Sequence, residues 1–250
     1  LIMTTVGEAN RLGIPEHRWV YLRGCADAQD HWFVTERDRL FESPAIRRAG
    51  REALEMAQCT IDEIDYIDLY SCFPSAVQIS RDELGVGADS PRPLTVTGGL
   101  PYFGGPANNY VMHSIATMMD MVRAKPGSKG LCSAIGWYIT KHAIGVYSTE
   151  PFEGEWRRKD PASCQRDIDA LPKAEVAIEA DGPATIETYT VLHGRETAER
   201  GIIVGRLEDG KRFVAQTPND PAVYSRMMSE ECVGATGKVR FDGALTQFDF

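Results

Sequence analysis

Three short segments carry residue types that could bind or transform a small molecule. Residues 70–74 (YSCFP) follow a strand-like run and precede a helix, residues 98–106 (GGLPYFGGP) form a loop before a second helix, and residues 133–137 (SAIGW) end a strand in a glycine turn. In an open α/β sheet, ligands bind beyond the carboxyl ends of the strands. The order of the three segments therefore predicts one site at that edge of a sheet.

The loop at residues 98–106 offers backbone rather than side-chain chemistry. Its glycines permit positive φ angles and a close approach of a ligand to the main chain. The helix that follows presents unpaired N–H groups and the positive end of its dipole. The loop has neither the dinucleotide nor the Walker spacing, since no Lys-Ser or Lys-Thr pair follows its glycines. We therefore expect no bound cofactor here.

Helices and strands alternate around these segments. Ser43-Pro44 starts a helix, because Ser is a favoured N-cap and Pro a favoured first helical residue. The sequence predicts helices over residues 7–12, 43–58, 75–84 and 107–124, and strands over residues 1–6, 20–24, 66–70, 94–97, 130–135 and 143–147. This order predicts an α/β fold for residues 1–150, a layered sheet with helices on both faces.

Residues 93–119 contain no Asp, Glu, Lys or Arg. The stretch is long enough to cross a bilayer, which takes about 20 apolar residues. Its two Gly-Gly pairs and three prolines would leave backbone groups unsatisfied in lipid, so we expect no membrane span. The helix over residues 107–119 is apolar on nearly every face. The sequence predicts that it is almost fully buried between two sheets, one of which this chain supplies.

Composition changes near residue 150. Residues 151–172 are charged and bracketed by proline, which is typical of a linker. The tail then predicts a helix over residues 222–228 and strands over residues 175–179, 184–192, 201–207, 212–216 and 233–241, with a hairpin turn at residues 208–211. These short strands predict a small all-β barrel of the OB type over residues 173–250. A sandwich edge and an SH3-like barrel are the alternatives.

The overall composition is that of a globular protein. The chain has 250 residues, of which 43% are hydrophobic and 25% charged, and its formal charge is 27 − 36 = −9. These values exclude a disordered chain, a collagen and a coiled coil. The negative charge, spread over both parts of the chain, argues against nucleic acid as a partner.

The six cysteines form no C-x-x-C pair, so we expect no metal site and no redox dithiol. Reduced thiols predict a cytoplasmic protein, and no signal peptide is apparent. The chain starts with Leu in a strand-like run. We therefore expect it to begin inside a larger protein, which would supply part of the site.

The order and spacing of the three segments resemble the C-terminal half of the thiolase superfamily, over about residues 1–148. The resemblance implies half of a five-layer α-β-α-β-α protein that acts on acyl-CoA thioesters in lipid metabolism. It implies coenzyme A thioester as substrate, no other bound cofactor, and an N-terminal thiolase half with the nucleophilic cysteine as partner. A homo-oligomer is a further expectation.

The resemblance also assigns residues. Tyr70 stands where the family has the Asn or His that orients an oxyanion-hole water. Gly105 stands where the family has its catalytic His, and Ala134 where it has its acid/base Cys. Gly136 is retained, and its backbone N–H serves an oxyanion hole. The candidate catalytic residues are therefore Tyr70, Tyr102 and Gly136, and the candidate substrate-binding residues are Cys72, Phe73, Gly104 and Gly105.

Three functions follow from this resemblance. The first is acyltransferase-type C–C bond chemistry of the acetyl-CoA acetyltransferase kind, with the nucleophile in the other half. The second is retro-aldol cleavage of a 3-hydroxyacyl-CoA, in which Tyr70 and Tyr102 converge on one cavity and move the proton, and the OB-like tail is a fused partner similar to the DUF35 type. A phenol has a pKa of about 10 and needs strong help to act as a base. The third is a non-catalytic thioester-binding or scaffold protein.

Overall fold

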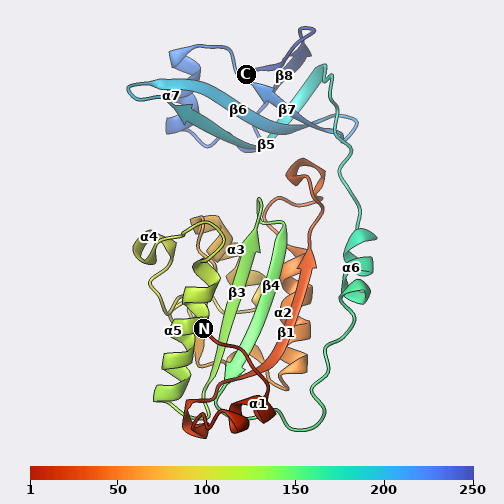
Figure 1. The fold of residues 1–250 in the computed structure, drawn as a ribbon. Helices are drawn as coiled ribbons and strands as arrows, with labels where there is room; N and C mark the ends of the chain where they lie inside the picture. The colour runs from red at the N-terminus through yellow and green to blue at the C-terminus, as the bar shows by residue number, and fades with distance from the viewer. The chain divides into compact units, whose positions relative to one another are not determined.

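The computed structural model describes residues 1–250, which divide into two compact units (Figure 1). The sheet unit comprises Leu1–Trp32 and Phe41–Leu171. The barrel unit comprises Pro172–Phe250 together with the inserted segment Phe33–Leu40. Each unit has its own hydrophobic core.

The sheet unit is built on four strands in the order β1-β4-β3-β2. These are β1 (Tyr21–Gln29), β2 (Tyr66–Asp68), β3 (Lys129–Gly136) and β4 (Lys141–Ser148). β2 and β3 are parallel, whereas β1 and β3 both pair antiparallel with β4. The parallel pair brings the carboxyl ends of β2 and β3 to the same edge, as the sequence order predicted.

Helices pack on both faces of this sheet, so the unit is a layered α/β structure. On one face α2 (Pro44–Met56), α3 (Pro74–Leu84) and α6 (Pro161–Asp169) enclose the larger core. On the other face, α5 (Tyr110–Ala124) packs through Met118 and Val122. Ser43 caps α2 as expected, since its hydroxyl accepts from the backbone N–H of Ile46 at 3.2 Å.

Two predicted strands of this unit are wrong. Residues 1–5 lie outside any helix or strand, and α1 follows them (Val6–Arg11). Ile2 is 88% exposed, because no strand of this chain pairs with these residues. Residues 94–97 are also irregular: the backbone N–H groups of Val96 and Thr97 donate to the Asp68 carboxylate instead of to a neighbouring strand. The following loop contains a short helix, α4 (Leu100–Phe103).

The predicted burial of residues 107–119 is wrong for this chain. Helix α5 begins only at Tyr110, and one stripe of it is buried, namely Tyr110, Ser114, Met118 and Val122. The opposite stripe is exposed, and Met112 retains 51% of its accessible surface. The physical reason is that α5 packs against a sheet on one side only.

The barrel unit is a closed barrel of five strands in the order β5-β6-β7-β9-β8. The strands are β5 (Gly182–His193), β6 (Ala198–Leu207), β7 (Arg212–Gln216), β8 (Thr236–Phe241) and β9 (Thr246–Asp249), and α7 (Pro221–Ser229) lies between β7 and β8. The 208–211 hairpin is confirmed, with Gly210 at φ +85°. The predicted strand over 175–179 is wrong, since only Val176 forms an isolated bridge, and β9 was not predicted.

The observed unit boundaries differ from those expected from composition. Segment 33–40 belongs to the barrel unit, where Arg212 anchors it: this fully buried guanidinium donates to the carbonyl oxygens of Thr35 (2.8 Å), Arg37 and Asp38. Residues 151–171 belong to the sheet unit and are not merely a linker. They include α6, which buries Cys164 and Ile168 in the core of that unit.

None of the helices has the length and apolar character needed to cross a membrane.

Candidate functional site

The structure joins the three predicted segments at one edge of the sheet. The backbone N–H of Tyr70, just beyond β2, donates to Ser133 Oγ of β3 at 3.0 Å. The next residue, Ser71, accepts from the backbone N–H of Leu100 at 2.9 Å and so fixes the Gly-rich loop. Residues 70–74, 98–106 and 133–137 therefore meet where the sequence predicted a site.

Asp68, the last residue of β2, organises this edge. Its side chain is buried, and one carboxylate oxygen accepts from the backbone N–H groups of Val96 (2.9 Å) and Thr97 (3.2 Å). The other accepts from the hydroxyls of Tyr110 (3.0 Å) and Ser114 (2.8 Å) of α5. One buried carboxylate thus connects the strand, the approach to the Gly-rich loop and the helix that follows it.

Tyr70 packs against Tyr110 rather than Tyr102. The rings of Tyr70 and Tyr110 meet edge to face with centroids 5.3 Å apart. Tyr102 is 88% exposed on α4, so the predicted convergence of Tyr70 and Tyr102 on one cavity is not seen in this chain. Burial raises the pKa of Tyr70, and burial together with the Asp68 charge raises the pKa of Tyr110 to about 12. Both phenols therefore hold their protons at neutral pH.

The remaining candidate residues border the same edge with different exposure. Cys72 is half-buried, and burial raises the pKa of its thiol, which disfavours a thiolate nucleophile. Phe73, Gly104 and Gly105 are exposed. Gly136 is half-buried at the end of β3, and the ammonium of Lys141 lies 3.8 Å from the point that a Gly136 Cβ would occupy.

Sequence reasoning missed the aromatic residues that complete this edge. Phe103 of α4 lies 6.4 Å from the Tyr110 ring and 5.4 Å from the His113 ring, centroid to centroid. His113 Nε2 lies 3.3 Å from Asn109 Nδ2. His113 is thus half-exposed beside the loop rather than packed in a core. The sequence feature that could have indicated the burial of Tyr110 is its spacing: it lies four residues before Ser114 and therefore on the same face of the helix.

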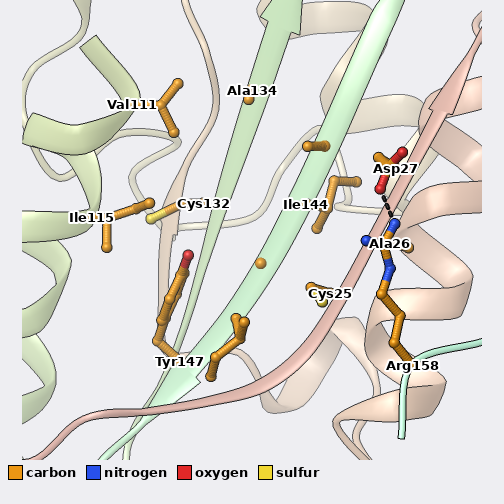
Figure 2. Close-up of a pocket in the computed structure, with 13 residues that line it drawn as sticks. Cys25, Ala26, Asp27, Val111, Ile115, Cys132, Ala134, Ile144, Tyr147 and Arg158 are labelled. Carbon is orange, nitrogen blue, oxygen red and sulfur yellow. Dashed lines mark hydrogen bonds and ion pairs between the residues drawn. The ribbon is translucent and has the colours of Figure 1, made fainter. Parts of the chain in front are cut away.

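A separate cavity of about 190 Å³ opens beside α5, on the side of the sheet that this helix covers only in part (Figure 2). Cys25 and Cys132 line it, and both pair in register with the intervening Gly145. The hydroxyl of Tyr147 lies over Gly145, only 2.7 Å from the position of an added Cβ. Burial raises the pKa of Cys132 to about 12, so this thiol is inert. Of the positions aligned with the thiolase motifs, Ala134 lines this cavity.

No cluster of three or more His, Cys, Asp or Glu side chains is placed to hold a metal ion. The six cysteines are unpaired.

The chain is similar to thiolase-like proteins in two comparisons. Residues 163–244 match the model of the thiolase-like protein type 1 additional C-terminal domain. The fold matches a crystal structure of a monomeric SCP2-thiolase like protein type 1 from Mycobacterium smegmatis, with 41% identity and a TM-score of 0.91. That match covers 99% of this chain and 54% of the other, so the chain spans about half the length of its relative. No curated protein matches the chain.

Together with the layered α/β sheet and the closed barrel, these matches support the membership of this chain in the thiolase-like superfamily.

Proposed function

We propose that this chain binds an acyl-CoA thioester at the edge formed by residues 70–74, 98–106 and 133–137, and that it takes part in acyltransferase-type C–C bond chemistry. The observation that carries the proposal is the meeting of these three segments through Ser71 and Ser133. In this proposal the chain supplies oxyanion stabilisation, and the nucleophile comes from the other half of the protein.

The proposed oxyanion donors are the backbone N–H of Gly136 and the hydroxyl of Tyr70. The Tyr70 phenol is protonated at neutral pH, since its ordinary pKa of about 10 is raised further by burial, and it is therefore available to donate a hydrogen bond as negative charge develops on the substrate. The same shift argues against Tyr70 as the base of a retro-aldol lyase. The exposure of Tyr102 argues in the same direction.

A non-catalytic thioester-binding protein is the second candidate. It is favoured by Gly105 and Ala134, which carry no group that can move a proton where the thiolase motifs have His and Cys. Claisen chemistry needs both an acid–base group and an oxyanion hole. The two candidates therefore differ in whether the remainder of the protein supplies the acid–base group.

We infer that this remainder covers the partly open face beside α5. That face carries the cavity, whose lining includes the small residues Ala134, Ala143 and Gly145. Figure 2 shows Ala134 in this lining, and the adjacent helix exposes Met112. The relative from M. smegmatis is about twice as long as this chain, which leaves room for a second thiolase half. That relative is a monomer, which favours a monomer over the homo-oligomer suggested by the resemblance.

We also infer that the barrel is of the OB type. Its support is the strand order β5-β6-β7-β9-β8, the parallel pairing of β7 with β9, and α7 between β7 and β8. We further propose that this barrel is similar to the DUF35 type and is fused to a thiolase-like half. Unpaired cysteines agree with a reducing compartment, and we propose the cytoplasm.

Calorimetric titration of the complete protein with an unreactive thioether analogue of acetyl-CoA tests the proposal. We expect saturable binding that Tyr70→Phe weakens about 2- to 10-fold, the value of one neutral hydrogen bond. Tyr21→Phe, remote in the chain from all three segments, is the matched control. Absence of binding, or equal affinity in the Tyr70 variant, would contradict a thioester site at this edge.

A further inference from the structure

A second feature of the sheet unit is an exposed aromatic platform, which we define as Trp32, Trp137 and Tyr138. The rings of Trp32 and Trp137 are stacked, with centroids 5.6 Å apart and an interplanar angle of 23°. The ring of Tyr138 packs at a steep angle against Trp137, at 5.3 Å. The three side chains retain 44%, 60% and 65% of their accessible surface. Exposed rings gathered in this way can accept a further planar group.

The turn that carries the platform is strained. Trp137 and Ile139 adopt φ angles of +59° and +49°, which are costly for residues other than glycine and most of all for a β-branched one. Ile139 packs against the core of the sheet unit, and Thr140 is fully buried. This backbone conformation turns Ile139 and Thr140 inward and leaves Trp137 and Tyr138 at the surface.

Buried hydrogen bonds hold both sides of the platform in place. The Thr140 N–H donates to the Gly136 carbonyl at 3.2 Å, and the Thr140 carbonyl accepts from the Asp30 N–H at 2.9 Å. The Asp30 carboxylate in turn accepts from the Ala45 N–H at 3.0 Å and from the Ser43 hydroxyl. Since Trp32 lies two residues after Asp30, the two stacked rings extend from one buried network. The platform is therefore preorganised, which lowers the entropic cost of binding.

A positive charge accompanies the rings. Lys141 begins β4 directly after the strained turn, its side chain is exposed, and its ammonium lies beside Gly136. Flat rings beside a lysine suit a planar heteroaromatic ligand that carries an anion, because stacking and charge attraction then act together. The formal charge of −9 disfavours a long polyanion such as nucleic acid.

We propose that Trp32, Trp137, Tyr138 and Lys141 form a binding site for a purine nucleotide. The base stacks on the aromatic platform, and Lys141 pairs with a phosphate. The ligand could be a free nucleotide or the adenosine end of a coenzyme A molecule, since the two share this chemistry. The site overlaps the proposed thioester edge at Trp137, which ends segment 133–137, but it uses neither Tyr70 nor the Gly-rich loop.

Calorimetric titration of the complete protein with ADP, adenosine, inorganic phosphate and coenzyme A tests the site. We expect ADP to bind saturably and more tightly than adenosine or phosphate alone. Trp137→Leu should weaken ADP binding at least 10-fold, and Lys141→Gln should weaken it about 3- to 10-fold and reduce its dependence on salt. Trp156→Phe, which alters an exposed tryptophan outside the platform, should bind as the parent does.

Coenzyme A titration identifies which ligand the site takes, and circular dichroism checks that the variant protein is folded. Because Trp137 also ends segment 133–137 of the thioester edge, the source of the ligand is assigned with Trp32→Leu. Coenzyme A binding that Trp32→Leu weakens would assign the site to the adenosine end of coenzyme A, whereas binding of ADP but not of coenzyme A would assign it to a free nucleotide. The near-ultraviolet circular dichroism of Lys141→Gln, which keeps both stacked rings, should match that of the parent. If ADP and coenzyme A both fail to bind at millimolar concentration, or if Trp137→Leu binds both normally, the proposal is overturned.

Discussion

At the residue scale, the candidate site consists of hydroxyl groups that keep their protons. Burial raises the pKa of Tyr70, and the pKa of Tyr110 rises to about 12. Gly105 and Ala134 have no titratable side chain, so neither can act as a general base, and the proposed function uses Tyr70 and Gly136 as oxyanion donors. Such a half-site is consistent with a protein whose remaining groups come from another part of the fold.

The tyrosines yield one prediction at this scale. If retro-aldol chemistry occurred, Tyr70→Phe and Tyr102→Phe should each lower cleavage of a 3-hydroxyacyl-CoA by the complete protein. We expect instead that Tyr70→Phe weakens thioester binding and that no cleavage is detected in the parent. Measured cleavage that both variants reduce would restore the retro-aldol function.

A second prediction at this scale concerns the ion pair of the barrel unit between the fully buried Arg212 and the partly exposed Glu187. Glu187 accepts two hydrogen bonds from Arg212, both 2.7 Å long. Burial alone would raise the pKa of Glu187, but the hydrogen bonds and charge of Arg212 lower it overall. Because the folded-state pKa is depressed, the pair contributes stability above the unfolded value of about 4.3, and this contribution is lost as pH falls through the folded-state pKa.

Glu187→Gln should therefore destabilise the protein by about 3–5 kcal/mol near neutral pH, because it leaves a fully buried guanidinium without its counter-charge. The loss should shrink as pH falls below 4. Glu175→Gln removes an exposed pairing with Lys211 and serves as the control, with an expected effect of about 0–1 kcal/mol. Urea unfolding across pH measures both, and a pH-independent loss in Glu187→Gln would contradict the linkage.

At the element scale, a side chain rather than a strand ladder positions the Gly-rich loop. Residues 94–97 have the apolar, β-branched character of a strand, yet their N–H groups at Val96 and Thr97 turn to Asp68. The Thr97 hydroxyl also lies 2.6 Å from the Tyr110 hydroxyl. The loop and α5 are therefore coupled through one buried carboxylate.

Asp68→Asn should disrupt both elements at once. The amide nitrogen would face donors that the carboxylate now satisfies, at a cost of about 3 kcal/mol for buried groups left unpaired. Asp62→Asn, at a largely exposed carboxylate near Arg92, is the control and should change stability by less than about 0.5 kcal/mol. Amide hydrogen exchange should become faster in residues 94–114 of Asp68→Asn, and unchanged exchange there would contradict the assigned role of Asp68.

At the scale of the whole molecule, a sheet with helices on both faces still leaves one face partly uncovered. The exposed stripe of α5 excludes a two-sheet sandwich built by this chain alone, and the chain spans 54% of the thiolase-like relative. Apolar faces of this kind mark interaction surfaces. The interpretation that combines both findings is that another part of the same protein covers α5.

Two measurements on the complete protein follow at this scale. If another part of the protein covers α5, the Met112 side chain, which is 51% exposed in this chain, should be protected from oxidative labelling, whereas exposed Met228 of the barrel should be labelled normally.

With acetoacetyl-CoA and CoA as substrates, we expect the complete protein to show little or no thiolysis. Turnover of roughly 1–10³ per second, the range of ordinary enzymes, would contradict the alignment of Gly105 and Ala134 with the thiolase residues.

The amino-acid sequence by itself determined the local elements and their order. Ser43-Pro44 started α2 where capping rules place it, and the Asp209-Gly210 turn joined β6 to β7. The order of residues 70–74, 98–106 and 133–137 predicted their meeting at one edge, because parallel strands expose their carboxyl ends together. These features depend on contacts between near neighbours in sequence or on simple topology.

Only the tertiary structure decided which side chains meet across the fold. Tyr70 packs on Tyr110, whose hydroxyl donates to the buried Asp68, and not on Tyr102, which is exposed on α4. Apolar composition predicted that residues 1–6 and 107–119 are buried. Burial also requires a partner surface, which this chain does not supply. Segment 33–40 joined the barrel unit through the bridge between Arg37 and Lys173 and through the buried Arg212, which donates to the Arg37 carbonyl 175 positions away in sequence. Such long-range contacts leave no periodic signal in the residues that make them.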